Sequence, residues 1–436
     1  MVPVPKNRIH LAHLGCAKNL VDSEIYLGHF LRLGFSNTED PQKADLVVVN
    51  TCGFINSAKE QSIDTILHHV QDGRKVIVSG CFYQRYSEIE KQFPEVVGWL
   101  QSNQWEEVRS LVDRLGFKTP AFASQPPPWK RIALEHSPFA YLRISQGCNK
   151  SCTFCSIPGF KGKLVSRSID SLVLETQSLI DRGAKEINLV SQDTVAYGLE
   201  FKGHSTGGEP LRKLIQELSK LDLERIRLLY LYPLWLKPAF YEFMAESKKV
   251  CNYIDMPLQH CSPDILTRMK RPGNASRYLK ELSTIRPIFP EVAIRSTFIA
   301  GFPTETETCF NELKDFIKAA RFDWMGVFTY STEDGTPAAD LQPRVHPKTR
   351  ERRQRELVHC YEETRSDLPS RLGKQYSVIL EERQGEIFIG RSEFQAPEVD
   401  GLTYVSEYQG ELGDKIEIRV VEESGFDDLA VPLGKP

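Results

Sequence analysis

Strand-like and helix-like segments alternate along most of this 436-residue chain, and this alternation constrains the fold more than any other feature. In the first part, short apolar runs at 8–14, 45–50 and 75–80 are typical of buried strands, and helix-like stretches such as 57–70 follow them. Alternating strands and helices favour a parallel sheet with helical crossovers. The sequence therefore predicts an amino-terminal α/β domain over residues 1–125.

A cysteine follows each of these three strands: Cys16, Cys52 and Cys81. The carboxyl ends of neighbouring parallel strands lie along one edge of the sheet, where open α/β sheets bind ligands. Thiols that are far apart in sequence would therefore converge in space. The chain has ten cysteines, and scattered buried thiols are the alternative. The repeated placement favours metal binding, because clustered cysteines in a reducing compartment bind metals more often than they form disulfides.

A second series of strand–helix units follows the proline-rich stretch TPAFASQPPPWK (119–130), which suits a semi-rigid linker. Six units in one run suggest an incomplete (β/α) barrel over residues 134–368, with reactive groups on the loops at the carboxyl ends of its strands. The predicted strands are FAYLRIS (139–145), KEINLVS (185–191), RIRLLYLY (225–232), NYIDMPL (252–258), VAIRSTFIA (292–300) and DWMGVFTY (323–330).

Two further segments complete the predicted fold. The charged stretch at 346–368 predicts a solvated helix; a nucleic-acid contact is the alternative, which its mixed signs disfavour. Residues 371–436 contain short strand-like runs broken by glycines, which predict a small all-β barrel. The predicted fold class is thus α/β, with an amino-terminal parallel sheet, a central partial (β/α)6 barrel and a small carboxyl-terminal β-barrel.

The motif GCNKSCTFC places Cys148, Cys152 and Cys155 directly after the first barrel strand, with the spacing C-x3-C-x2-C. Three thiolates on one short loop can hold three irons of a four-iron cluster and leave the fourth without a protein ligand. Zinc is the alternative, but a structural zinc site uses four ligands, commonly in two separated pairs. Iron–sulfur clusters use runs of closely spaced cysteines, so the loop predicts an iron–sulfur cluster.

This motif resembles the signature of the radical S-adenosylmethionine (SAM) superfamily, and the domain order resembles its methylthiotransferase branch, which ends in a small TRAM β-domain. The resemblance implies an enzyme with two [4Fe-4S] clusters and SAM as cofactors. It implies that Cys148, Cys152 and Cys155 hold the first cluster, whose open iron binds SAM and generates a 5′-deoxyadenosyl radical. It also implies that Cys16, Cys52 and Cys81 hold the second cluster, and that an electron donor such as flavodoxin or ferredoxin reduces the enzyme.

Polar residues at other strand ends fit a bound nucleoside. By analogy with the family, the predicted SAM contacts are Ser191, Gln192, Asp193, Gln259, Arg295 and Gly301. Thr304 is a plausible cap of the helix that follows. His260 is interpreted as a hydrogen-bonded structural histidine rather than an acid or base. No catalytic side chain is assigned, and Cys251, Cys261, Cys309 and Cys360 are interpreted as ordinary thiols.

The family offers two substrate classes: adenosines of transfer RNA, or an aspartate β-carbon of the small-subunit ribosomal protein twelve. The stretches LGCAKNLVDSE (14–24), YIDMPLQH (253–260) and GRSEFQAPEVDG (390–401) resemble the second branch. Residues 371–436 contain seven basic and fourteen acidic side chains. An acidic domain opposes RNA binding and attracts a basic ribosomal protein, although acidic surfaces also simply aid solubility. Glu398 and Asp400 are the first candidates for docking acids.

A non-enzymatic alternative is an iron–sulfur electron carrier or scaffold, which explains the cysteines but not a six-unit barrel with polar strand ends. The net charge of −3 gives no overall basic footprint for nucleic acid. The first residues contain no apolar segment with a small-residue cleavage site, and the apolar runs are too short to span a membrane. We therefore expect a cytoplasmic protein without membrane contact.

Overall fold

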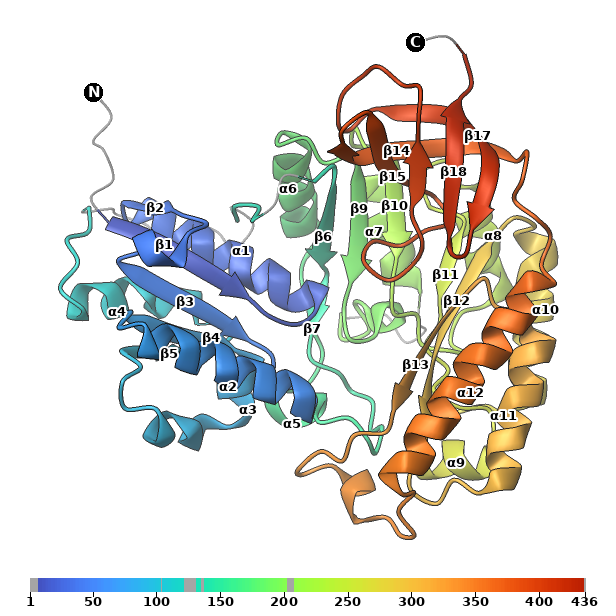
Figure 1. Cartoon of the computed structure of the whole chain (residues 1–436), viewed down its shortest axis with the longest axis horizontal. Helices are drawn as coiled ribbons and strands as arrows, with labels where there is room; N and C mark the ends of the chain where they lie inside the picture. Colours follow the sequence, from blue (N-terminus) through green and yellow to red (C-terminus); the bar gives the residue numbers. More distant parts are fainter. Residues whose placement is uncertain (1–6, 103, 121–130, 135–136, 202–207, 435–436) are drawn as a thin grey trace. The chain divides into compact units, whose positions relative to one another are not determined.

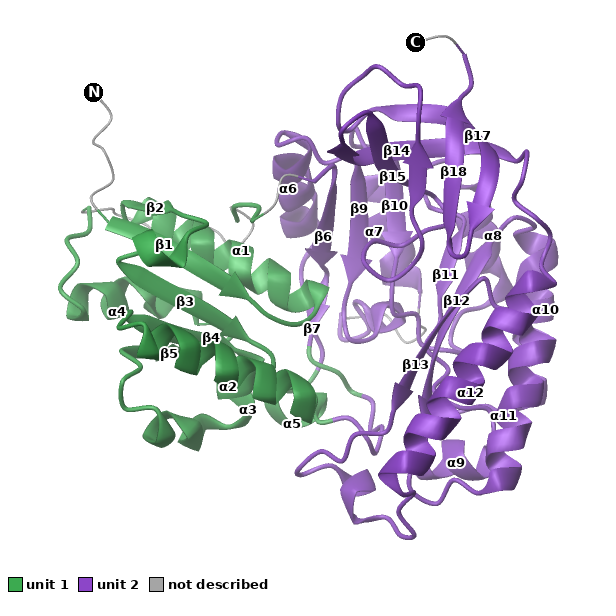
Figure 2. Ribbon diagram, viewed as in Figure 1, with its two compact units in different colours: residues 1–136, 147–149, 156–163 green, residues 137–146, 150–155, 164–436 purple. Residues whose placement is uncertain are grey.

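The computed structural model describes the chain except for residues 1–6, 103, 121–130, 135–136, 202–207 and 435–436. It forms two compact units, shown in Figure 2: unit 1 comprises residues 1–136, 147–149 and 156–163, and unit 2 the remainder. Most of the predicted linker at 119–130 lies outside the described residues. The domain boundaries expected at 125/134 and 368/371 stay predictions.

Unit 1 contains the predicted parallel sheet, in the order β2-β1-β3-β4-β5 (Figure 1). Its central strands are formed by continuous apolar runs because both faces of the sheet are covered by helices. All six residues of β3 and all five of β4 are buried. The strands are β1 (Asn7–His13), β2 (Phe35–Asn37), β3 (Leu46–Thr51), β4 (Val76–Gly80) and β5 (Gly98–Leu100), and the helices are α1 (Ala17–Arg32), α2 (Asn56–Gln71), α3 (Cys81–Arg85), α4 (Val108–Arg114) and α5 (Ile157–Lys161).

Unit 2 begins with the six predicted barrel strands, which form two parallel three-stranded sheets, β10-β9-β6 and β11-β12-β13. A single β-bridge between Ile226 and Val250 lies where the two sheets adjoin. The outer strands β6 and β13 are not paired with each other in the described structure, so the sheet is open, as predicted for an incomplete barrel. The strands are β6 (Phe139–Arg143), β9 (Glu186–Val190), β10 (Arg225–Leu228), β11 (Tyr253–Asp255), β12 (Ala293–Ala300) and β13 (Trp324–Thr329), and the short pair β7 (Ser145–Gln146) and β8 (Val165–Ser166) flanks the three-cysteine loop.

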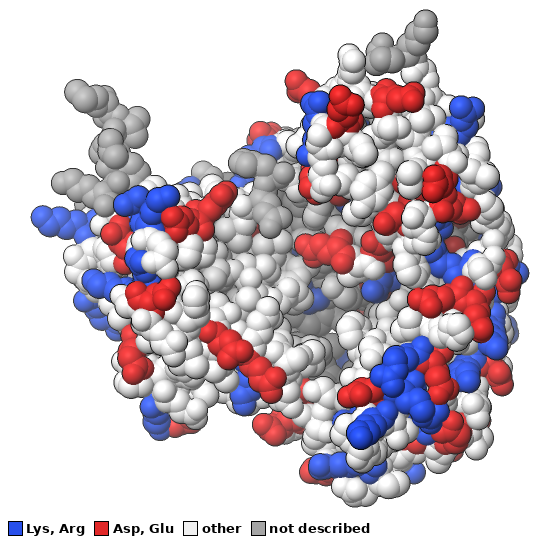
Figure 3. Space-filling model, viewed as in Figure 1, with Lys and Arg blue, Asp and Glu red and all other residues white. Residues whose placement is uncertain are grey.

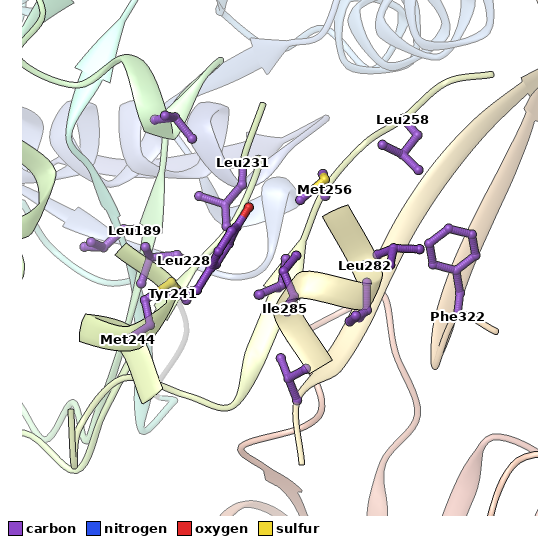
Figure 4. Packing of buried hydrophobic residues seen from close by; sticks show 14 of the residues in the cluster. Leu189, Leu228, Leu231, Tyr241, Met244, Met256, Leu258, Leu282, Ile285 and Phe322 are labelled. Atoms are coloured by element: carbon purple, nitrogen blue, oxygen red, sulfur yellow. The ribbon is translucent and has the colours of Figure 1, made fainter. Parts of the chain in front are cut away.

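Helices cover the outer face of these strands because each presents an apolar stripe to them. Figure 4 shows part of this core, where Leu189 of β9 and Leu228 of β10 pack near Tyr241 and Met244 of α8. The helices are α6 (Ile169–Ile180), α7 (Glu209–Leu218), α8 (Pro238–Glu246), α9 (Pro263–Arg268), α10 (Ala275–Ile288), α11 (Glu307–Ala320) and α12 (Pro347–Ser366). This packing fixes the strand ends that carry the candidate site.

The charged stretch at 346–368 forms α12, as predicted. Its basic and acidic side chains pair on the surface: Arg352 bridges Glu307 and Glu356, and Lys314 reaches Glu356. Figure 3 shows Lys and Arg side chains interleaved with Asp and Glu on this face. The basic and acidic side chains on this face therefore form ion pairs with one another. No helix in the described part of the chain is long and apolar enough to cross a membrane.

The carboxyl-terminal segment closes into a barrel in the order β14-β15-β16-β18-β17. Its core is small and apolar, with Val378, Leu380 and Phe388 fully buried. The predicted all-β barrel is thus confirmed, whereas its bounds stay a prediction. Its strands are β14 (Gln375–Gln384), β15 (Ile387–Ser392), β16 (Thr403–Val405), β17 (Lys415–Ser424) and β18 (Asp427–Pro432).

Buried charges join this small barrel to the strands of the larger one within unit 2. Glu186 of β9 lies 3.0 Å from Arg227 and 3.2 Å from Arg391 of β15, and 3.9 Å from Arg225. Arg225 and Arg227 also donate to backbone carbonyls of β15, those of Arg391 and Ser392. Because buried charges require partners, this network fixes how the small barrel docks.

Candidate functional site

The amino-terminal cysteines occupy the carboxyl edge of the unit 1 sheet. Cys16 precedes α1, Cys52 follows β3, and Cys81 is the first residue of α3, directly after β4. Cys16 is exposed, Cys52 is buried and Cys81 is partly buried. The strand ends therefore bring together three residues that are widely separated in sequence.

Two glycines permit the close approach of these loops. Gly15 has φ +98°, and a Cβ there would lie 2.8 Å from the Cβ of Cys52. Gly80 also has φ +98°, and a Cβ there would lie 2.4 Å from Asn50 Oδ1. Positive φ disfavours side chains other than glycine, so any larger residue at these positions would separate the cysteine-bearing loops.

Buried side chains fix the same loops by hydrogen bonds to the backbone. Asn19 Nδ2 donates to the carbonyls of Leu14 and Thr51, at 2.6 and 3.2 Å. Ser62 of α2 accepts from the Cys52 amide at 3.1 Å and donates to the Cys52 carbonyl at 2.8 Å. The geometry of the three-cysteine edge is therefore held by residues that are not themselves candidate ligands.

At Cys52 and Cys81, burial and nearby lysines act on the pKa of the thiol in opposite directions. Burial raises the pKa of Cys81 to about 11, and Lys161 opposes this shift. Burial also raises the pKa of Cys52, against the influence of Lys161 and Lys18. A metal ligand must be a thiolate, so the lysines favour the form that binds metal.

The second cysteine motif follows β7, and the boundary between the units passes through its loop. In unit 1, Gly147 has φ +76°, and the Cys148 amide donates to the Gly162 carbonyl at 3.1 Å. In unit 2, the Cys155 amide donates to the Cys152 carbonyl at 3.1 Å, so these two cysteines share a tight turn. All three thiols are partly exposed, as a loop that receives a cofactor requires.

No three His, Cys, Asp or Glu side chains in the described residues surround a point as ligands of one metal ion would. A single-ion site such as structural zinc therefore has no support in the described structure. The thiolates of a four-iron cluster bind different irons, and so they lie farther apart than the ligands of one ion. Iron–sulfur clusters at the two cysteine triads stay predictions.

The predicted nucleoside contacts after β9 lie in a short polar turn. Ser191 is buried and accepts hydrogen bonds from Ser145 and from the Asp193 amide. Asp193 caps a short turn by accepting from the Ala196 amide, and its Oδ2 lies 3.6 Å from Lys150 Nζ. Gln192 Oε1 is buried and has no hydrogen-bond partner in the described structure. An unpaired buried acceptor is costly, so Gln192 fits a residue that bonds a ligand.

The strand ends after β11 and β12 lie beside each other. The Gln259 amide donates to the Thr297 carbonyl at 2.8 Å, and its backbone has φ +73°. Gly301, also at φ +73°, donates from its amide to Glu305 Oε2 at 2.8 Å. Burial raises the pKa of Glu305 to about 7, against the opposing effect of Arg353. Gln259 and Gly301 thus lie at one edge, whereas their contact with SAM stays a prediction.

His260 is structural, as interpreted from the sequence. It is fully buried, and its Nδ1 lies 2.9 Å from the amides of Cys261 and Ser262, from which it accepts. Burial lowers its pKa to about 3. Because Nδ1 accepts from two backbone amides, the neutral ring carries its proton on Nε2, which lies 3.8 Å from Glu305 Oε2. The charged imidazolium that would serve as a general acid does not form near neutral pH.

Two expectations from the sequence are wrong. The cap of α11 is Thr306, which accepts from the Cys309 amide, whereas Thr304 has φ +73° and a buried hydroxyl without a hydrogen-bond partner. Asp400 is not a surface docking acid: its side chain is fully buried, 3.3 Å from Arg295, and bonds the Tyr253 hydroxyl. Glu398 is exposed, but it accepts from the Tyr141 hydroxyl at 3.1 Å, and so it contributes to docking within the chain.

Arg295 consequently has a role that the sequence did not indicate. Its Nη1 lies 3.2 Å from Asp255 and its Nε 3.3 Å from Asp400, so it links β11, β12 and the small barrel. Its expected contact with SAM stays untested. Arg271 and Lys161 were also missed, because each lies in a loop or short helix with no motif that distinguishes it from a surface cation.

Three family models match successive parts of the chain. An uncharacterized protein family, UPF0004, matches residues 8–101, the radical SAM superfamily matches 142–317, and the TRAM domain matches 372–431. The curated relatives include ribosomal protein uS12 methylthiotransferase RimO from Aquifex aeolicus, 41% identical over 96% of this chain and 96% of the relative. The same enzyme from Thermotoga maritima is 40% identical over 96% and 98% of the two chains.

This chain belongs to the uS12 methylthiotransferase family. It is therefore a radical SAM methylthiotransferase, and the family implies SAM and a [4Fe-4S] cluster as cofactors. Among solved structures, the radical SAM methyltransferase TsrM from Kitasatospora setae has a TM-score of 0.55 at 14% identity, covering 76% of this chain and 77% of that chain. That likeness confirms the fold of this uS12 methylthiotransferase family member.

Proposed function

We propose that this enzyme transfers a methylthio group to the β-carbon of an aspartate in ribosomal protein uS12. The observation that carries the proposal is similarity over nearly the whole chain to enzymes named for this substrate, 41% identical to the relative from Aquifex aeolicus. The similarity extends through the TRAM domain, the part in which substrate selection is expected, and not only through the radical SAM region.

In the barrel, Cys148, Cys152 and Cys155 would hold the cluster that binds SAM. When bound, the cluster and SAM would together provide the chemistry that removes a hydrogen atom from an unactivated C–H bond. The side chains of this enzyme would position the nucleoside of SAM. The unpaired Gln192 Oε1 is available to accept a hydrogen bond from the nucleoside, and Lys150 holds Asp193 at 3.6 Å beside it. Ser191 and Gly301 fix the two strand ends.

A second [4Fe-4S] cluster would be held by Cys16, Cys52 and Cys81. The placement of these cysteines at one sheet edge, after successive strands, supports it. In the family this cluster is thought to carry the sulfur that is transferred. We further propose a flavodoxin or ferredoxin as the electron donor, because cluster reduction requires a one-electron carrier.

Substrate capture would use acids that the structure leaves exposed on the small barrel. Asp400, Glu381 and Asp428 are paired with arginines of this chain, so they contribute little to its external field. Exposed acids remain at Glu382, Glu386, Glu407, Glu411, Glu417 and Glu422. A basic ribosomal protein would be steered by such a surface.

The test is mass spectrometry of ribosomal proteins and transfer RNA from cells that lack this protein. We expect uS12 to lose its methylthio group and to regain it when the gene is restored, while methylthioadenosine in transfer RNA is unchanged. If methylthioadenosine is lost from transfer RNA while uS12 keeps its methylthio group, the enzyme belongs to the transfer-RNA branch.

A further inference from the structure

Arg271 is a cation in direct contact with a cysteine of the loop at 148–155. It lies just beyond α9, in the turn before α10, and its Nη1 donates to Cys152 Sγ at 3.6 Å. Its Nη2 donates to the Pro257 carbonyl at 2.5 Å. The guanidinium thus joins the cysteine loop to the segment that follows β11.

Several contacts hold Arg271 in this position. Its guanidinium lies over the Tyr232 ring, 4.6 Å from the centroid, and the ammonium of Lys150 is 4.2 Å from the same centroid. Its backbone amide donates to the Leu266 carbonyl at 2.9 Å. The Tyr278 hydroxyl donates to the carbonyl of the next residue, Pro272, at 2.6 Å. These contacts hold both the side chain and the backbone of Arg271 in place.

The cysteine loop is attached to the same segment by its backbone. The Thr153 amide donates to the Met269 carbonyl at 3.1 Å, and the Thr153 hydroxyl donates to the Arg268 carbonyl at 2.7 Å. Cys152 and Arg271 consequently cannot separate without breaking these bonds. The contact between the sulfur and the guanidinium is part of a rigid arrangement.

A guanidinium that donates to a cysteine sulfur also acts on a cluster held by that sulfur. Once a cluster is bound, hydrogen bonds to its sulfurs and nearby charge set its reduction potential. A positive donor favours the reduced state, which carries one more negative charge. Groups that contact ligands rather than the metal often control metal sites in this way.

We propose that Arg271 is a positioning residue that holds Cys152 as a cluster ligand and raises the reduction potential of the cluster at Cys148, Cys152 and Cys155. This inference rests on the proposed iron–sulfur cluster at that loop. It assigns to one arginine the task of making the cluster easier to reduce, which determines how readily the enzyme accepts an electron.

The experiment is a redox titration followed by electron paramagnetic resonance of anaerobically reconstituted full-length protein. Cys16, Cys52 and Cys81 are replaced by alanine in every sample, so that only the loop cluster contributes. Arg271→Gln removes the charge, Arg271→Lys retains it, and Arg268→Gln is the matched control. Arg268 is exposed, lies three residues away and contributes only its backbone carbonyl to the loop.

We expect Arg271→Gln to lower the midpoint potential so that the ratio of reduced to oxidised cluster falls at least about tenfold at a fixed solution potential, a shift of about 59 mV for one electron. Arg271→Lys should shift it less, and Arg268→Gln should leave it unchanged. If Arg271→Gln loses iron, recovery of iron in Arg271→Lys supports the proposal.

Three results would overturn it: an unchanged potential in Arg271→Gln, an equal shift in Arg268→Gln, or iron loss in both Arg271 variants while Arg268→Gln retains iron. Failure of the proposed cluster itself has a different signature, because the parent with an intact loop would then bind no iron.

Discussion

Glu186 should control docking of the small barrel. Its side chain is 1% exposed and is surrounded by Arg225, Arg227 and Arg391. Glu186→Gln would remove the counter-charge shared by three buried guanidinium groups, of which Arg391 alone keeps a second carboxylate partner, Glu381. Removing one partner from a buried ion pair typically costs about 3–5 kcal/mol. Since each 1.4 kcal/mol is a tenfold change in an equilibrium constant, opening of the docked barrel should become more frequent by at least about 10²-fold.

Hydrogen exchange followed by mass spectrometry measures this opening at peptides from β14 and β15. Glu224→Gln is the matched control, because Glu224 also pairs with a residue of the small barrel, Lys415, at 3.0 Å, but both side chains are about 40% exposed and such pairs contribute about 0–1 kcal/mol. We expect fast exchange in Glu186→Gln and parent-like exchange in Glu224→Gln. Equal exchange in Glu186→Gln and the parent would refute the assignment of docking to the buried network.

Three further predictions follow from the site and the network. Reconstituted protein should hold about eight irons. Alanines at Cys148, Cys152 and Cys155 should leave about four irons and abolish 5′-deoxyadenosine formation, whereas alanines at Cys16, Cys52 and Cys81 should spare that reaction. Iron analysis and an assay for 5′-deoxyadenosine check both expectations. Gly15→Ala should reduce iron at the amino-terminal triad, because its Cβ would lie 2.8 Å from that of Cys52, while Gly183→Ala, at a similar φ with open space, should not; equal iron in both would contradict the steric argument. Burial would raise the pKa of Glu186, but Arg227 and Arg391 outweigh it and lower the pKa to about 2 from an ordinary 4.5. The stability difference between the parent and Glu186→Gln should therefore be full above about pH 4.5 and disappear as pH falls towards 2, as measured by exchange across that range.

The sequence predicted the central strands because their apolar runs are long enough to show a pattern. It missed β2 and β5, which have three residues each, too few for any periodicity. The three cysteines of unit 1 were predictable as a group, since each follows a strand and parallel strands end at one edge. The residues that fix them, such as Asn19 and Ser62, bond backbone atoms far away in sequence, and no local pattern reveals such bonds.

Charged residues were the least predictable part of the site. Asp400 lies in a polar, turn-like stretch, and its burial results from a partner 105 positions away, Arg295. Arg225 and Arg227 alternate with apolar residues in β10, a pattern typical of a solvent-facing edge, yet the small barrel covers them. Thr304 and Thr306 are equally good caps by residue type, and only the backbone conformation distinguishes them.

The most direct measurement of the central claim is product analysis after incubating the reconstituted enzyme with SAM, a one-electron reductant and purified uS12. The account predicts uS12 in which one hydrogen is replaced by a methylthio group on an aspartate, with formation of 5′-deoxyadenosine. Changing Glu382, Glu386, Glu407 and Glu411 together to lysine should slow this modification without changing iron content. If uS12 stays unmodified while adenosine in a transfer-RNA sample is methylthiolated, the central claim is contradicted.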